Sequence, residues 1–268
     1  MPDSLPPHRT VALPTRHLGR RLLVFPQLDS TNTLALALGS DPTQHGLALL
    51  ALEQTVGRGQ YGRLWQAPPR SSVLMSLLLF PPAPLRRPAL IVAWAAVSVC
   101  ETIAQLTERA PTIKWPNDVL IAGKKVCGIL IEQRTSGDPD WPLATALGIG
   151  LNVAQSAQTF TSAELPDAGS LFSMAGVAAD TEDVAVQLIR QLDEQYGRLL
   201  DGDFTALEAQ WQRRLGLLGR QVRVEAVDRE LRGRLVELTL DGLRIEMAGG
   251  ATVRLAPEAV RHLWSAVA

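Results

Sequence analysis

The stretch Gly57-Arg58-Gly59-Gln60-Tyr61-Gly62-Arg63-Leu64-Trp65 decides how the rest of this sequence is read. Its three glycines allow backbone N–H groups to approach an anion closely, and its two arginines supply positive charge. The spacing also matches the G-x-G-x-x-G pattern of dinucleotide-binding folds, in which the loop leads directly into a helix. Here Pro68-Pro69 and two serines follow, which argue against a helix. The stretch therefore predicts an anion-binding loop in a nucleotide-using enzyme of another fold.

A second cluster of polar residues lies further along the chain. Lys114-Trp115-Pro116-Asn117-Asp118 places a cation and a carboxylate four residues apart. Lys125 follows seven residues after Asp118 and enters an apolar run, where a buried lysine is costly unless it meets an anion. Its neighbour Lys124 is interpreted as a solvated turn residue. Together with the glycine loop, this cluster predicts a polyanionic substrate.

The composition excludes several classes of protein. The chain has 268 residues, with 26 basic and 27 acidic side chains, and this balance argues against a dedicated nucleic-acid binder. Two cysteines and four scattered histidines predict no disulfide framework and no metal held by a dedicated protein site. The N-terminus lacks the pattern of a secretory signal, and the apolar run from Pro88 to Cys100 is too short to span a bilayer. We therefore expect a cytoplasmic protein with no membrane partner.

The hydrophobic pattern predicts an α+β protein in three parts. Residues 1–20 contain four prolines and are expected to form a flexible N-terminal arm. Residues 21–218 alternate buried strands with helices and are expected to form the main domain. From Gln221 the period changes to two, with Asp-Gly and Gly-Gly turns, so residues 219–268 predict a small β-barrel or sandwich. Helices are predicted from about Ser30, and over 87–109, 181–199 and 204–215; strands are predicted over 46–52, 73–80, 112–115, 126–132, 144–153, 222–224, 231–240, 243–247 and 252–255.

An ordered set of motifs between about residues 25 and 155 resembles the biotin protein ligase family. The motifs are Asp29-Ser30-Thr31-Asn32, Glu53-Gln54-Thr55, the loop from Gly57 to Trp65, Lys114 to Asp118, Lys125-x-x-Gly128-Ile129-Leu130-x-Glu132 and Gly150-x-Asn152. Each motif alone is weak, but their shared order is specific. The resemblance implies a catalytic domain similar to class II aminoacyl-tRNA synthetases, with a mixed sheet and helices, followed by an SH3-like domain.

The resemblance also implies a two-step reaction. Biotin and ATP, with Mg²⁺ arriving on the nucleotide, give biotinyl-5′-AMP and pyrophosphate. A lysine of a biotin carboxyl carrier protein, from acetyl-CoA carboxylase or a related carboxylase, then receives the biotin. Such chemistry between anions needs charge neutralisation and positioning above all.

The family's site residues can be carried over position by position. The residues expected to bind biotin are Ser30, Thr31, Asn32, Gln54, Arg58, Gly59, Gln60, Lys125 and Gly128. Those expected to bind the nucleotide are Gly57, Arg58, Arg63, Trp65, Lys114, Asn117 and Asn152. The expected catalytic residues are Lys125, Arg58 and Asp118, with Lys125 bridging the biotin carboxylate and the α-phosphate, and Trp65 providing a platform for adenine.

One position departs from the family pattern. Many members have an arginine at the position of Gln60, and that arginine helps to retain the adenylate. Glutamine keeps hydrogen bonding but loses the charge, so we expect the intermediate to escape more readily here.

Two other interpretations compete with this one. A lipoate or octanoate ligase or transferase shares the fold and an active-site lysine, although the glycine loop and Lys114 to Asp118 favour biotin. A transcription regulator would carry an additional N-terminal winged helix-turn-helix, which needs roughly twice the about 25 residues that precede the first motif. We therefore expect a ligase without repressor activity and without a nucleic-acid partner, acting as a monomer or homodimer.

Overall fold

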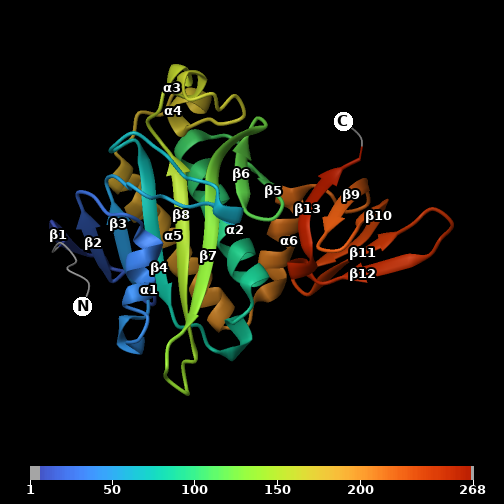
Figure 1. The fold of residues 1–268 in the computed structure, drawn as a ribbon, viewed down its shortest axis with the longest axis horizontal. Coiled ribbons are helices and arrows are strands. Elements are labelled where there is room, and N and C mark those ends of the chain that lie inside the picture. The colour runs from blue at the N-terminus through green and yellow to red at the C-terminus, as the bar shows by residue number, and fades with distance from the viewer. Residues whose placement is uncertain (1–6, 267–268) are drawn as a thin grey trace.

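The computed structural model describes residues 7–266 and consists of two sheets with helices packed around the larger one (Figure 1). The larger sheet has eight strands in the order β1-β2-β3-β4-β8-β7-β6-β5. All neighbouring strands in it are antiparallel except β2 and β3, which are parallel. Its strands are β1 (Arg9–Ala12), β2 (Arg21–Phe25), β3 (Leu47–Ala51), β4 (Ser72–Leu79), β5 (Thr112–Lys114), β6 (Asp118–Ile121), β7 (Lys124–Thr135) and β8 (Leu143–Asn152).

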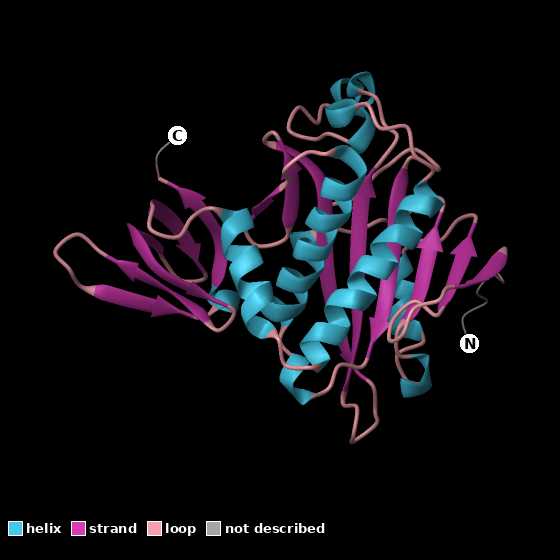
Figure 2. Cartoon of the chain, turned by 180° about the vertical axis from the view of Figure 1, so that it is seen from behind, coloured by secondary structure: helices cyan, strands magenta, loops and turns pink. Residues whose placement is uncertain are grey.

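Helices cover both faces of this sheet unequally. The short helix α1 packs on one face, against β4 and β8, while the long helices α2 and α5 pack together on the other face (Figure 2). The buried apolar residues accordingly form two clusters, a large one beneath α2 and α5 and a small one beneath α1. The helices are α1 (Thr31–Ala37), α2 (Pro88–Thr107), α3 (Ala157–Ser162), α4 (Leu171–Ala175), α5 (Thr181–Leu200) and α6 (Phe204–Leu215), with 3₁₀ turns η1 (Pro42–Gln44), η2 (Gln60–Gly62), η3 (Ala83–Leu85) and η4 (Pro257–Ala259).

The two long helices follow from their sequences. Helix α2 begins at Pro88, whose fixed φ and missing N–H suit the first helical position. Helix α5 is capped by Asp180, whose carboxylate accepts hydrogen bonds from the backbone N–H groups of Glu182 and Asp183. Both helices match the predicted ranges within two residues at each end.

Helix α2 is long and apolar enough to cross a membrane by length and composition alone. In the structure, 67% of its most apolar stretch is buried inside the protein. It contacts α5, α6 and β7, so it is the central core helix of the fold.

The predicted flexible N-terminal arm is wrong for residues 9–20. Strand β1 pairs along its whole length with β2. The following turn is bound by Asp193 of α5, whose carboxylate accepts backbone hydrogen bonds from Arg16, His17 and Leu18 at 2.8, 2.6 and 2.7 Å. Three such bonds satisfy a nearly buried carboxylate and fix the turn to the helix. Residues 1–6 of the predicted arm lie outside the described residues.

The smaller sheet begins at Gln221, two residues beyond the start of the predicted C-terminal part. It is antiparallel, in the order β12-β11-β10-β9-β13. Its last strand was not predicted. The bounds are β9 (Gln221–Ala226), β10 (Glu230–Thr239), β11 (Gly242–Glu246), β12 (Thr252–Leu255) and β13 (Val260–Ser265).

Both cysteines are free and fully buried in the core. Burial raises the pKa of the Cys100 thiol to about 12, and it raises the pKa of Cys127 still further above its usual range. A thiol with such a pKa carries almost no thiolate at neutral pH, so neither cysteine is a candidate nucleophile.

Candidate active site

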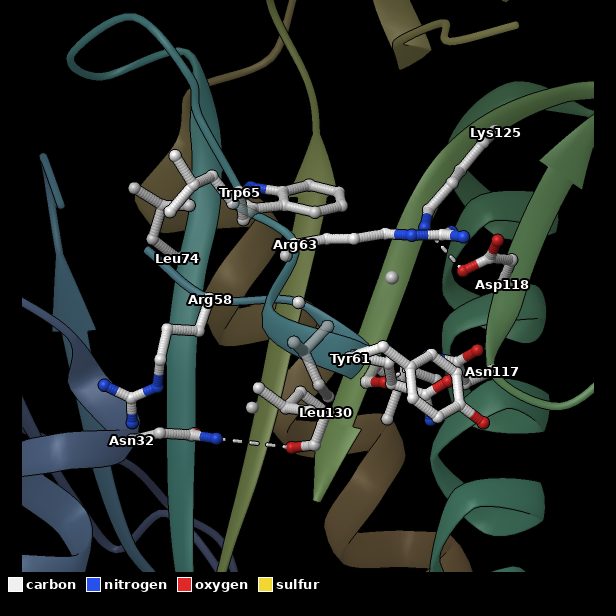
Figure 3. Close-up of a pocket in the computed structure, with 18 of the residues that line it drawn as sticks. Asn32, Arg58, Tyr61, Arg63, Trp65, Leu74, Asn117, Asp118, Lys125 and Leu130 are labelled. Atoms are coloured by element: carbon white, nitrogen blue, oxygen red, sulfur yellow. Dashed lines mark hydrogen bonds and ion pairs between the residues drawn. The ribbon is translucent and has the colours of Figure 1, made fainter. Parts of the chain in front are cut away.

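A pocket opens on the sheet face that carries α1, beneath the glycine loop (Figure 3). It is lined by most of the residues predicted for the site and by several that were not. The predicted residues in its lining are Ser30, Thr31, Asn32, Gln54, Arg58, Gly59, Gln60, Arg63, Trp65, Lys114, Asn117, Asp118, Lys125 and Gly128. The sequence motifs, which are up to about a hundred residues apart, therefore meet in one place.

The floor of the pocket is made of glycines on β7 and β8. Gly128 and Gly150 lie opposite each other in the sheet, and Gly148 lies two residues from Gly150 on the same face. A Cβ atom at Gly150 would lie 2.5 Å from Cε2 of Trp65, and one at Gly148 would lie 2.5 Å from Oδ1 of Asn32. The glycines are thus required because two pocket side chains rest directly on the sheet backbone.

The start of α1 forms one end of the pocket as a buried polar network. Gln54 Oε1 accepts hydrogen bonds from the backbone N–H and the hydroxyl of Thr31, at 2.8 and 3.1 Å. Ser76 Oγ lies 2.6 Å from both Thr31 Oγ1 and Asn32 Oδ1. The Asn32 amide donates to Glu132 at 2.8 Å. Ser30 occupies the N-cap position but makes no side-chain capping bond, so its hydroxyl is not committed to the helix.

The geometry of this network suits a small polar ligand. Its side chains from Ser30 to Asn32 are at most 5% exposed, and Ser76 is fully buried. Buried donors and acceptors in fixed positions reject ligands that lack matching groups, because an unpaired partner is costly. This end therefore has the properties of a specificity pocket.

The glycine loop forms a short hairpin over the pocket. Arg58 and Leu64 form a β-bridge, and the N–H of Trp65 donates to the carbonyl of Gly57 at 2.9 Å. The turn is η2, in which Tyr61 has a left-handed backbone with φ of 57° and a side chain that is 65% exposed. Gly57 itself does not line the pocket. A Cβ there would lie 2.3 Å from the carbonyl oxygen of Trp65, so its role is close packing within the hairpin.

Arg58 is directed away from the lysine of the second cluster (Figure 3). Its guanidinium pairs with Glu132 at 3.0 Å and donates to the hydroxyl of Thr33 at 2.8 Å. The sequence had predicted a cation available for the carboxylate and phosphate. In the structure Arg58 is paired beside the polar network, and its assignment to the carboxylate and phosphate stays a prediction.

Lys125 and Asp118 form the opposite end of the pocket. The Lys125 ammonium lies 2.6 Å from Asp118 Oδ1, and it lies 5.7 Å from the centre of the Trp65 ring. Antiparallel pairing of β6 with β7 brings the two residues together. Both side chains remain partly exposed, 36% for Lys125 and 18% for Asp118. Lys124 lies outside the pocket, where its ammonium donates to the carbonyl of Pro166.

The charges around the pocket favour an anion. Within residues 7–266, neither Arg63 nor Lys114 has an ion-pair partner, and Arg63 extends from the loop toward Lys125 and Asp118 (Figure 3). The charged side chains of the pocket and its rim are the cations Arg58, Arg63, Lys114 and Lys125 and the carboxylates Asp118 and Glu132. The excess of cations matches the predicted polyanionic substrate.

Two asparagines that were predicted to contact the nucleotide are bound to the protein. The Asn117 amide lines the pocket, but it donates to the carbonyl of Ile129 at 2.6 Å. Asn152 is buried behind the pocket, where its amide donates to Gly169 and accepts from Ser72. Asn152 thus supports the wall of the pocket, and its contact with the nucleotide stays a prediction.

Several residues of the site were missed by the sequence reasoning. Ser76 lies in the middle of an apolar strand, and the one available signal was a polar residue in an otherwise hydrophobic run. Glu132 was quoted as part of a motif but was assigned no role. His262 reaches the pocket from the smaller sheet, and no motif marked it.

A cationic glycine loop, a lysine and a buried specificity pocket on one sheet face define an α+β ligase or transferase that uses a nucleotide. The model of the Biotin/lipoate A/B protein ligase family matches residues 24–152. The bifunctional ligase/repressor BirA of Bacillus subtilis is 31% identical over 232 residues, which are 86% of this chain and 70% of that protein. The chain therefore belongs to the Biotin/lipoate A/B protein ligase family.

Two further proteins are similar over most of the chain. The biotin--[acetyl-CoA-carboxylase] ligase of Mycobacterium tuberculosis is 31% identical over 251 residues, covering 88% of this chain and 90% of that protein. The structure of the Aquifex aeolicus biotin protein ligase in complex with biotin and ATP superimposes with a TM-score of 0.75 and 26% identity. This alignment covers 91% of the present chain and 99% of the Aquifex chain. The similarity thus includes both sheets, and the α+β fold is that of biotin protein ligases.

Proposed function

We propose that this protein is a biotin–[biotin carboxyl carrier protein] ligase, which forms biotinyl-5′-AMP from biotin and ATP and transfers biotin to a lysine. One observation carries the proposal: the polar network at Thr31 and Asn32 and the Lys125–Asp118 pair lie at opposite ends of one glycine floor. The network suits the ureido ring of biotin, and Lys125 suits the point where carboxylate and phosphate meet. The biotin and ATP named for the Aquifex structure support this assignment.

The first step joins two anions. A carboxylate oxygen of biotin attacks the α-phosphorus of ATP, and the bond from that phosphorus to the bridging oxygen breaks, which releases pyrophosphate. The barrier contains the repulsion between the carboxylate and the phosphates, so a fixed cation between them lowers it. Lys125 supplies that cation, and Asp118 holds its ammonium in place. Arg63 and Lys114 are free to bind the β- and γ-phosphates.

The second step transfers the acyl group. The neutral amine of the acceptor lysine attacks the carbonyl carbon of the mixed anhydride, AMP leaves with the electron pair, and the amine loses a proton. The pocket contributes by holding the adenylate so that its carbonyl stays accessible. Gly128 and Gly150 allow the ring of Trp65 to rest directly on the sheet, where it can serve as a platform for adenine.

The finer features of the assignment are part of the same proposal. Residues 21–218, to whose sheet β1 adds an edge strand, form a catalytic domain similar to class II aminoacyl-tRNA synthetases, and residues 219–268 form an SH3-like domain. Mg²⁺ arrives with ATP; within residues 7–266 no group of three or more acidic, histidine or cysteine side chains is placed to hold a metal. The acceptor belongs to acetyl-CoA carboxylase or a related carboxylase. We propose a cytoplasmic monomer or homodimer without a nucleic-acid partner.

Exchange of radioactive pyrophosphate into ATP tests the first step directly. We expect exchange that depends on biotin and that lipoate and octanoate do not support. Exchange with lipoate and not with biotin would identify a lipoate ligase instead. Mass spectrometry of a purified carrier domain incubated with biotin and ATP then tests the transfer, through the mass added to one lysine.

The substitution Gln60→Arg tests how the loop retains the intermediate. Gln60 lies in the turn η2 over the pocket and brings no charge to it. An arginine there adds a charge-assisted hydrogen bond to the phosphate of the adenylate, worth about 1.5–3 kcal/mol. We expect the variant to release biotinyl-5′-AMP roughly tenfold or more slowly than the wild type. Chromatographic measurement of free adenylate from stoichiometric enzyme provides the rates, and equal rates would refute the role of this position.

A further inference from the structure

A β-bulge in the last strand determines which way His262 faces. Strand β13 pairs with β9 so that Val260 lies opposite Ala226 and Leu263 lies opposite Val224, which leaves one extra residue in β13. In a regular strand Val260 and His262 would share a face, since side chains alternate. Val260 and Leu263 are both buried in the core of the smaller sheet. The bulge therefore turns His262 to the other face.

His262 consequently lines the pocket, although it belongs to the smaller sheet. The end of the pocket next to His262 also contains Trp115. The indole N–H of Trp115 donates to the carbonyl of Val260 at 2.9 Å. Strand β13 thus abuts the segment from Lys114 to Asp118. The polar network around Thr31 lies at the opposite end of the glycine floor. Bulges often occur beside active sites, where they redirect one side chain.

The imidazole of His262 is held by stacking and has an unused polar atom. Its ring stacks on Trp264 with centroids 5.1 Å apart and an interplanar angle of 29°. The guanidinium of Arg223 lies over the ring of Trp264, 4.8 Å from its centroid. Nδ1 of His262 is buried, and no atom of residues 7–266 forms a hydrogen bond with it. Buried polar atoms in proteins are nearly always paired, and Nδ1 is shielded even from water, so the ring has to turn about its Cβ–Cγ bond toward the pocket for a bound ligand to supply the missing partner.

We propose that His262 is a nucleotide-binding residue whose Nδ1 forms a hydrogen bond to ATP and then to the adenylate. This inference rests on the proposed function, because it takes the end of the pocket near Lys114 as the nucleotide end. It makes the smaller sheet a part of the active site, with the Trp115–Val260 hydrogen bond fixing the position of β13 against the site.

Substitutions at His262 separate the hydrogen bond from the shape of the ring. Phenylalanine keeps a flat ring on Trp264 but removes Nδ1. Asparagine loses the ring but keeps a polar atom bonded to Cγ, as Nδ1 is. We expect His262→Phe to raise KM for ATP about three- to tenfold and to leave KM for biotin unchanged, since one ordinary hydrogen bond is lost. His262→Asn is expected to restore most of the affinity for ATP.

The binding test uses α,β-methylene-ATP, which cannot be cleaved to pyrophosphate at the α-phosphorus. Calorimetry in the presence of saturating biotin gives its Kd for wild type, His262→Phe and His262→Asn. The matched control is Arg261→Ala on the same strand, an exposed residue that does not line the pocket, and it should bind like wild type. Thermal unfolding of each variant shows that the smaller sheet remains folded.

Two results would overturn the inference. Wild-type affinity of folded His262→Phe for the nucleotide, with a loss only in His262→Asn, would show that the ring matters and that Nδ1 has no role. Equal weakening by phenylalanine and asparagine would show that a polar atom in the place of Nδ1 does not restore binding, which would refute the hydrogen bond. A wild-type protein that binds the analogue but lacks biotin-dependent exchange would refute the proposed function separately, while the Kd values still decide the role of His262.

Discussion

Replacement of Lys125 by methionine should lower the rate of biotin-dependent pyrophosphate exchange about 10²–10³-fold, the usual cost of removing one stabilising group from a transition state. Methionine keeps an unbranched apolar stem, in a side chain one atom shorter than that of lysine, but removes the cation between carboxylate and α-phosphate. It also leaves the Asp118 carboxylate, which is only 18% exposed, without its partner at 2.6 Å. An unpaired carboxylate at this point would repel both anionic substrates. Steady-state exchange assays with varied biotin and ATP measure the loss.

The chain provides a matched control one residue away. Lys124 belongs to the same strand and carries the same charge, but its ammonium binds the Pro166 carbonyl outside the pocket. Lys124→Met should therefore exchange pyrophosphate within about twofold of wild type, because exposed charges contribute little. Equal losses in the two variants would mean that net charge near the site matters and that Lys125 has no specific position in the reaction. A Lys125→Met variant with wild-type kcat would contradict its assignment outright.

The fold could be predicted from sequence where the signals were local. Helix α2 was marked by Pro88 and a long apolar stretch, and α5 by Thr181-Glu182-Asp183 and a regular apolar stripe. The buried strands β3 and β4 were marked by continuous apolar runs between turns. What decided these elements lies within about twenty residues of chain, so pattern and capping were sufficient.

The N-terminal segment shows why other elements could not be predicted. Prolines and charges suggested a flexible arm, yet residues 9–12 form an edge strand and the next turn is fixed by Asp193. The partners are more than 170 residues apart in sequence. A carboxylate that binds three backbone N–H groups produces no periodic pattern in the sequence. Such contacts can be found only in the three-dimensional structure.

The functional site, like the fold, could be predicted only in part from the sequence. The motifs predicted which residues gather in the pocket, because their residue types carry the chemistry. They did not predict which charges are already paired. Arg58 meets Glu132 and Lys125 meets Asp118, so each predicted catalytic cation has a carboxylate beside it. Such pairing lets the ligand-free pocket hold several cations without strong mutual repulsion, and it keeps each one in place for the substrate.

Substitutions in the glycine floor should change the KM values for biotin and ATP separately. Gly148 and Gly150 are two residues apart on one face of β8, so the substitution to alanine is the same at both positions. At Gly148 the new Cβ would press on the amide of Asn32, whereas at Gly150 it would press on the ring of Trp65, with 2.5 Å in each case. We expect Gly148→Ala to raise KM for biotin and Gly150→Ala to raise KM for ATP. Overpacking of about 1–3 kcal/mol corresponds to roughly 5- to 150-fold for each.

Each variant serves as the control for the other, because both add one methyl group to the same strand beneath the same pocket. General damage to the sheet would raise both KM values together in both proteins, and it would also lower the temperature of thermal unfolding. A crossed pattern, with each variant impaired for one substrate, requires that Asn32 and Trp65 serve different ligands at opposite ends of the floor. If Gly150→Ala impaired biotin and left ATP unaffected, Trp65 would belong to the biotin end, and the proposed orientation of the two substrates would be reversed.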